Sequence, residues 1–283
     1  MREVIISNPK NDSVGTQLLS LYEALKGAQA HEKLVFNFSK LKWACPSLIL
    51  PLSAYIKETD SSYNLAGSPI KSYFDAINFP RGINSISKFK AEERKNKTYT
   101  PISVLEKEEK ERRERLETLF QEMIYKILGA SESAKNAIYY PISELVTNIF
   151  EHSNKNHGFI FGQLYPQKEY IDICIADSGR GLGRTYLEEK RLKLSDEDAI
   201  REVMVGHSTK PNTGRGYGVR TSKRVVCEGL NGSFMLISGT AALISSGAQE
   251  ILTSLPDFYW PGVIVAYRIR KPKQPVDISR FIE

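Results

Sequence analysis

Three short motifs, in a fixed order along the chain, carry the residues best suited to chemistry. They are Glu144-Leu-Val-Thr-Asn148, then Asp177-Ser-Gly179-Arg-Gly181-Leu-Gly183, then Gly214-Arg-Gly216-Tyr-Gly218. Together they supply two carboxylates, a side-chain amide and two glycine-rich loops. A pocket built from these groups can hold a nucleotide, a metal ion and an attacking water.

The first motif falls within residues 132–153, where the apolar spacing predicts a helix. Glu144 and Asn148 are four residues apart, so their side chains share one face of that helix. An Asn amide oxygen is a suitable Mg²⁺ ligand, and a carboxylate one turn away can orient or deprotonate a water directed at a terminal phosphate. The alternative, the polar face of an amphipathic helix, is weakened because apolar residues flank both side chains.

Asp177 stands at the end of a predicted strand over residues 170–176 and opens a glycine-rich turn. A carboxylate there can accept a hydrogen bond from an exocyclic amine such as that of adenine. Gly179, Gly181 and Gly183 would let the backbone approach a flat base and adopt positive φ angles. A plain tight turn is the alternative for this motif alone. A dinucleotide-binding fold is not indicated, because the acidic residue precedes the glycines instead of following them.

The third motif precedes a predicted helix over residues 218–228. Backbone amides of such a loop, with the helix N-terminus, form a phosphate site. Upstream, Ser208, Thr209 and Lys210 can contact phosphate oxygens, and the long polar stretch over residues 184–213, with at least one helix, can form a lid. The alternative is a flexible surface loop. The expected contacts of the motif itself are Gly214, Arg215, Gly216, Tyr217 and Gly218.

The composition is that of a folded protein, with 283 residues of which 41% are hydrophobic and 25% are charged. No apolar run reaches the roughly 18 residues of a membrane-spanning helix, so we expect no membrane contact. The three cysteines and four histidines have no paired or metal-ligand spacing, which predicts a reducing, cytoplasmic location and no zinc site. A net charge of +6 suits nucleic acid, but scattered Lys and Arg residues do not favour that partner.

Residues 1–82 are predicted to form a small α/β domain. Short apolar runs alternate there with segments of helical spacing, and strand followed by helix, repeated, indicates a parallel or mixed sheet. The expected elements are strands over residues 4–6 and 33–38, a helix over residues 17–25, and an apolar helix that opens near Pro46.

A charged connection, residues 83–111, is predicted to join this domain to a second one over residues 112–270. The second domain begins with a helix that has one apolar stripe. Its strands over residues 159–165 and 170–176 are separated by a four-residue turn and should pair antiparallel. The tail, residues 271–283, is polar with prolines and is expected to be loose.

In this order the three motifs resemble the N, G1 and G2 boxes of the GHKL superfamily of ATP-binding domains, which includes gyrase, Hsp90, histidine kinases, MutL and anti-sigma-factor kinases. The resemblance covers about residues 112–270. It implies that Glu144 is the catalytic base, that Asn148 binds Mg²⁺ and that Asp177 reads the adenine amine. The implied fold class is α/β (α+β): a two-layer sandwich of a mixed sheet with helices on one face, and with ATP between the helices and the lid.

The N-terminal domain is similar, more loosely, to STAS domains. Those domains regulate anti-sigma kinases as separate chains, through a serine at the start of a helix. Ser47 stands nearest to that serine. The acidic residue that usually precedes it is absent, with Cys45 near its place, and a simple helix N-cap is the favoured interpretation of Ser47.

The motifs predict a protein that binds ATP and Mg²⁺, and three versions of its function stay open. The first is an ATPase that acts as a conformational switch, with lid closure sensed by the N-terminal domain or a protein partner. The second is a protein-serine kinase that acts on a STAS-like partner or on its own N-terminal domain. The third binds nucleotide without turnover and recognises a protein partner. The resemblance also implies a protein partner or a homodimer, whereas a sensor kinase is not indicated because residues 104–128 contain no His.

Overall fold

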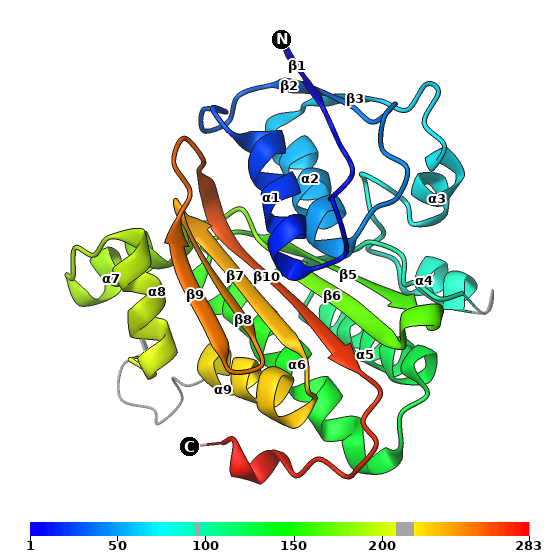
Figure 1. Ribbon diagram of the computed structural model, residues 1–283, viewed down its shortest axis with the longest axis vertical. Helices are drawn as coiled ribbons and strands as arrows, with labels where there is room; N and C mark the ends of the chain where they lie inside the picture. The colour runs from blue at the N-terminus through cyan, green and yellow to red at the C-terminus, as the bar shows by residue number, and fades with distance from the viewer. Residues whose placement is uncertain (94–96, 208–217, 283) are drawn as a thin grey trace.

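A computed structural model describes residues 1–93, 97–207 and 218–282. The described chain is a mixed α/β structure with two sheets, one of three parallel strands and one of seven antiparallel strands (Figure 1). The small sheet and its helices lie on one face of the large sheet, and a second set of helices lies on the other face (Figure 1). Among the described residues, no helix has the length and apolar character needed to cross a bilayer.

Strands and helices alternate in the N-terminal unit, residues 1–82, as the sequence predicts. The strand order is β1-β2-β3 and both pairs are parallel, because each connection is a helix that carries the chain back to the same end of the sheet. The elements are β1 (Arg2–Ile5), α1 (Val14–Leu25), β2 (Leu34–Asn37), α2 (Pro46–Thr59), β3 (Ser62–Asn64) and α3 (Lys71–Ala76).

The large sheet has the strand order β4-β5-β6-β10-β7-β8-β9. Every pair in it is antiparallel, so the predicted mixed sheet is wrong. For three of these pairs the reason is local, because short turns join β5 to β6, β7 to β8 and β8 to β9, and a short turn permits only antiparallel pairing. The strands are β4 (Ser103–Glu106), β5 (His157–Tyr165), β6 (Tyr170–Ala176), β7 (Ser233–Gly239), β8 (Ala241–Ser246), β9 (Gln249–Ser254) and β10 (Trp260–Arg270).

Three helices cover one face of the large sheet, namely α5 (Lys110–Leu128), α6 (Lys135–His152) and α9 (Gly218–Arg224) (Figure 1). Alternate residues of β6 point to this face, Ile171, Ile173 and Ile175, while Cys174 and Ala176 point to the other. The other α-helices of this part of the chain are α4 (Ile86–Glu93), α7 (Gly181–Lys190) and α8 (Asp196–Val205). Helix α9 continues as the π-helical turn η3 (Val225–Gly229).

The opposite face of the large sheet is covered by α1 and α2 of the N-terminal unit (Figure 1). The two parts of the chain share a hydrophobic core, in which Phe36 and Leu48 belong to the same cluster as Phe161 and Met235. Burial on both faces explains why the strands read as nearly continuous apolar runs.

A buried polar network crosses the contact between the N-terminal unit and the large sheet. Arg268 donates from Nε to Asp172 Oδ1 at 2.7 Å, and Gln17 Nε2 donates to the same carboxylate at 3.4 Å. Ser47, which is 2% exposed, donates its hydroxyl to Gln17 Oε1. The predicted N-cap role of Ser47 is wrong, because α2 begins at Pro46 and its N-cap residue is Cys45.

The predicted connection and tail both contain ordered structure. Residues 83–111 include α4 and β4, and β4 is an edge strand of the large sheet. The sequence predicts a loose tail, whereas Val276 and Phe281 pack against the hydrophobic core that lies between the large sheet and the helices α5, α6 and α9. The guanidinium of Arg224 lies 5.8 Å from the centre of the Phe281 ring, a cation–π contact that helps to hold the tail on η3.

Candidate functional site

The first motif lies on α6, with Glu144 and Asn148 half-buried on the face that meets α9. Gly218, the first residue of α9, lies against both side chains. A Cβ atom at Gly218 would stand 2.3 Å from Glu144 Oε2 and 3.7 Å from Asn148 Nδ2. The structure therefore brings together the two key residues of the first motif and the last glycine of the third.

Tyr140 extends this cluster by one helical turn, at the same four-residue spacing. Its hydroxyl lies near the side chain of Thr221 on α9. Burial, and then the negative charge of Glu144, raises the pKa of Tyr140. Glu144 thus lies beside a neutral phenol at the contact between α6 and α9. The spacing is visible in the sequence, but the contact with Thr221 is not.

Gly218→Ala is expected to displace the Glu144 carboxylate without unfolding the protein. The atom in the way is the end of a flexible side chain, and alanine favours helix over glycine. If Glu144 is the general base, we expect ATP turnover to fall about tenfold. The midpoint of thermal unfolding should move by no more than about 2 °C. Phosphate release and a thermal melt measure the two effects.

Gly15→Ala is the matched control for this variant, because Gly15 is also in the first turn of a helix and a Cβ added there would have nothing within 4 Å. It should leave turnover unchanged. Equal turnover in the Gly218 and Gly15 variants would show that the contact with Glu144 has no part in the chemistry.

Asp177 follows β6 directly and is 3% exposed. Its Oδ1 accepts a hydrogen bond from the Gly179 amide at 2.8 Å, and its carbonyl accepts one from Trp260 Nε1 at 2.8 Å. A Cβ at Gly262 would lie 2.4 Å from Asp177 Oδ1, so β10, which begins at Trp260, closes over the carboxyl group. Burial raises the pKa of Asp177 to about 7, although the hydrogen bond from Gly179 opposes the shift.

Two glycines of the second motif, Gly179 and Gly181, are glycine for different structural reasons. Gly181 has a φ of +66°, and α7 begins there. Gly179 and Gly183 have no positive φ, so the prediction of positive φ angles is wrong for these two residues. A Cβ at Gly179 would lie 2.1 Å from the carbonyl oxygen of Ser153, directly after α6. The second motif therefore packs against the end of the helix that carries the first.

Of the third motif, only Gly218 is among the described residues. The other predicted contacts, Ser208, Thr209, Lys210, Gly214, Arg215, Gly216 and Tyr217, lie outside them. Arg220 Nη1 on α9 donates to the carbonyl oxygen of Val205 at the end of α8, at 3.2 Å. The two elements that flank residues 208–217 are therefore tied to each other beside α6.

Glu58 of α2 connects the N-terminal unit to the segment between α6 and β5. Its carboxylate pairs with Lys155 Nζ at 2.7 Å and with His157 Nε2. Burial alone would raise the pKa of Glu58, but the hydrogen bonds from His157 and Lys155 lower it to about 2. An ionised carboxylate of the N-terminal unit is thus held next to the second motif. No local pattern relates these residues in the sequence.

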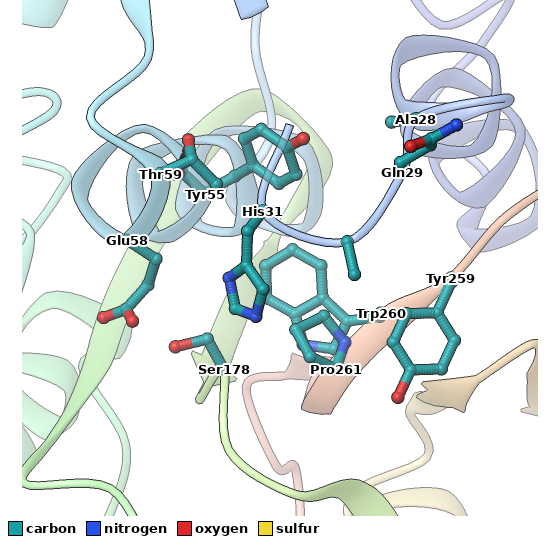
Figure 2. Close-up of a pocket in the computed structure, with 11 residues that line it drawn as sticks. Ala28, Gln29, His31, Tyr55, Glu58, Thr59, Ser178, Tyr259, Trp260 and Pro261 are labelled. Atoms are coloured by element: carbon teal, nitrogen blue, oxygen red, sulfur yellow. Dashed lines mark hydrogen bonds between the residues drawn. The ribbon is translucent and has the colours of Figure 1, made fainter. Parts of the chain in front are cut away.

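Figure 2 shows a small cavity between the N-terminal unit and the second motif, where His31 and Glu58 face Ser178 and Trp260. Its volume is about 20 Å³, room for about one water molecule. A larger open groove of about 990 Å³ is lined by the end of α5, the β5–β6 turn and residues 270–276. Neither of these hollows, which described residues alone line, includes Glu144 or Asn148.

Within residues 1–93, 97–207 and 218–282, no group of three or more His, Cys, Asp or Glu side chains could hold a metal ion. The donors on α6 suit a different arrangement. Glu144 has a carboxylate and Asn148 an amide oxygen, both hard oxygen donors, and the two side chains lie against Gly218. Mg²⁺ commonly takes one or two such protein ligands and completes its shell with water and substrate phosphates.

Comparison of the chain with protein-family models, with curated proteins and with solved structures found no match. Any functional conclusion therefore depends on the chemistry and geometry of the site itself.

Proposed function

We propose that this protein binds ATP with Mg²⁺, hydrolyses it slowly and uses the change of bound nucleotide as a conformational switch. The observation that carries the proposal is the convergence of Glu144, Asn148 and Gly218, where no Cβ fits between the first and third motifs. Residues suited to water activation, cation binding and phosphate contact meet at one place, although they come from separate parts of the sequence.

Each residue has a role that follows from its chemistry. The Glu144 carboxylate orients the attacking water and accepts its proton. Asn148 offers its amide oxygen to Mg²⁺, which neutralises phosphate charge when it is bound. Asp177 accepts a hydrogen bond from the adenine amine, and Gly218 brings backbone close to a phosphate. Tyr140 lies beside Glu144 and Thr221 at the contact between α6 and α9, where it helps to position the carboxylate.

The N-terminal unit is the proposed sensor of nucleotide state. The ion pairs of Glu58 attach α2 to the segment that follows α6, and Ser178 of the second motif faces the same unit across the small cavity (Figure 2). A change in the second motif on nucleotide binding therefore has a direct physical route to α2.

Phosphorylation of the protein's own Ser47 is the less favoured version. The Ser47 side chain is 2% exposed, and its hydroxyl is hydrogen-bonded to Gln17 where the N-terminal unit meets the large sheet. A phosphate donor cannot reach that hydroxyl unless the N-terminal unit leaves the sheet.

Incubation with γ-labelled ATP separates the versions of the proposal. The hydrolysis version predicts labelled free phosphate that depends on Mg²⁺ and stops on chelation, with no label on the protein. Label on this chain, or on an added STAS-domain protein, would instead establish a serine kinase. Retained nucleotide without phosphate release would indicate binding alone. A chain that retains no nucleotide would contradict all three versions.

A further inference from the structure

Arg180, in the middle of the second motif, makes contacts that a plain turn residue does not need. Its side chain is 15% exposed. Its backbone amide donates to the carbonyl oxygen of Ser153 at 3.0 Å, and its Nε donates to the carbonyl oxygen of His152 at 2.6 Å. The last carbonyls of a helix have no partner within the helix, and a positive charge beside them is favourable. Arg180 therefore caps the end of α6.

The other side of the same guanidinium binds α7. Nη1 donates to Glu188 Oε2 at 2.8 Å, and Nη2 pairs with Glu189. Because the guanidinium is planar and has several fixed donors, one side chain can hold the end of α6 and two carboxylates of α7 at the same time. A lysine has a single point of charge and cannot make this set of bonds.

We propose that Arg180 is a positioning residue that fixes the distance between the two ends of the nucleotide site. This inference rests on the proposed function, in which α6 contacts the phosphates through Asn148 and the loop after β6 contacts the base through Asp177. Arg180 and the close contact of Gly179 with Ser153 join that loop to the end of α6. A ligand that spans both ends requires this fixed distance, whereas a ligand that touches one end does not.

The test compares two ligands on three variants. Arg180→Lys and Arg180→Met remove the fork of bonds, and Arg184→Met is the control. Arg184 lies on α7 and also pairs with Glu188. Its side chain is 69% exposed, however, and that bond stays within α7. Dissociation constants are measured for Mg-ATP and, by competition, for adenosine, together with the midpoint of thermal unfolding.

For both Arg180 variants we expect the Kd for Mg-ATP to rise about tenfold while the Kd for adenosine changes less than about twofold. The Arg184 variant should match the wild-type protein for both ligands. Loss of affinity for both ligands in parallel would show general destabilisation and would overturn the inference. So would wild-type affinity for Mg-ATP in Arg180→Lys.

Glu189→Gln provides a second, milder variant in case replacement of Arg180 prevents folding. It removes the charge that pairs with Arg180 and lies 3.7 Å from His152 Nδ1, and it leaves the bond from Arg180 Nε to the His152 carbonyl oxygen. A rise of about twofold to threefold in the Kd for Mg-ATP is therefore expected, with adenosine binding unchanged. Equal affinity in this variant and the wild-type protein would count against the role of α7. A wild-type chain that binds neither ligand would overturn the proposed function itself, whereas wild-type binding with no selective loss overturns only the role of Arg180.

Discussion

Asp177→Asn is expected to weaken ATP binding about 50-fold and, at the same time, to stabilise the fold at neutral pH. The loss of binding follows from the proposed contact with adenine, because an amide presents only one acceptor oxygen and a competing donor. In the structure, Oδ1 of Asp177 already accepts a hydrogen bond from the Gly179 amide at 2.8 Å. An asparagine can keep this local bond while losing the acceptor that the base requires.

The gain in stability follows from the raised pKa of Asp177, which is about 7 in the folded chain against an ordinary value of 3.8. The folded state prefers the neutral carboxyl group, so ionisation costs stability as the pH rises above 3.8, and the full cost is present above about pH 7. Asparagine is neutral at every pH. At pH 8 the variant should be more stable by on the order of 4 kcal/mol, and the difference should vanish below about pH 4.

Denaturant unfolding at pH 8 and pH 4, with ATP titration at pH 8, measures both effects. Asp75→Asn is the control, because Asp75 is exposed and should change neither quantity. A less stable Asp177 variant at pH 8 would show that the charged carboxylate stabilises the fold. Unchanged ATP affinity would remove Asp177 from the proposed site.

Glu144→Ala is expected to reduce ATP turnover about 1,000-fold and to leave the Kd for Mg-ATP within about threefold of the wild-type value. In the proposed mechanism the carboxylate acts on water in the transition state, so its loss should affect the chemical step more than ground-state binding. Steady-state phosphate release and equilibrium titration separate the two quantities.

Glu151→Ala is the matched control for Glu144→Ala, since Glu151 is an exposed carboxylate on the same helix, α6. Its turnover should equal that of the wild-type protein. If the two variants are equally active, the general base lies elsewhere. If Glu144→Ala loses binding and turnover together, Glu144 holds the nucleotide site in shape instead of acting on water.

Much of the architecture could be predicted because it depends on local pattern. The alternation of strand and helix in residues 1–82 and the antiparallel pair of β5 and β6 follow directly from apolar spacing and turn length. The sequence does not predict the strands β8 and β9, since β9 has mostly exposed or half-buried residues and lacks a clear apolar alternation. Nor does it predict the helix α7, because its buried residues are only Gly181, Thr185 and Tyr186 and they form no apolar stripe.

Contacts between distant parts of the chain set the limit of prediction for the site. The spacing of Glu144 and Asn148 places both on one helical face, but only the structure brings Gly218 against them. The pairing of Glu58 with Lys155 depends on the N-terminal unit covering the large sheet, which no local pattern records. Glycine at position 179 is required by the close approach of Ser153, so its presence in the motif reflects packing as well as any contact with a base.

Calorimetric titration of the wild-type chain with ATP and with GTP, both in excess Mg²⁺, tests the central claim most directly. The account predicts saturable binding of one ATP per chain and at least about tenfold weaker binding of GTP, because guanine presents a carbonyl oxygen where adenine presents the amine whose hydrogen bond Asp177 would accept. Equal affinity for the two nucleotides would contradict the role of Asp177. Absence of binding for both would contradict the assignment of this protein as an ATP-dependent switch.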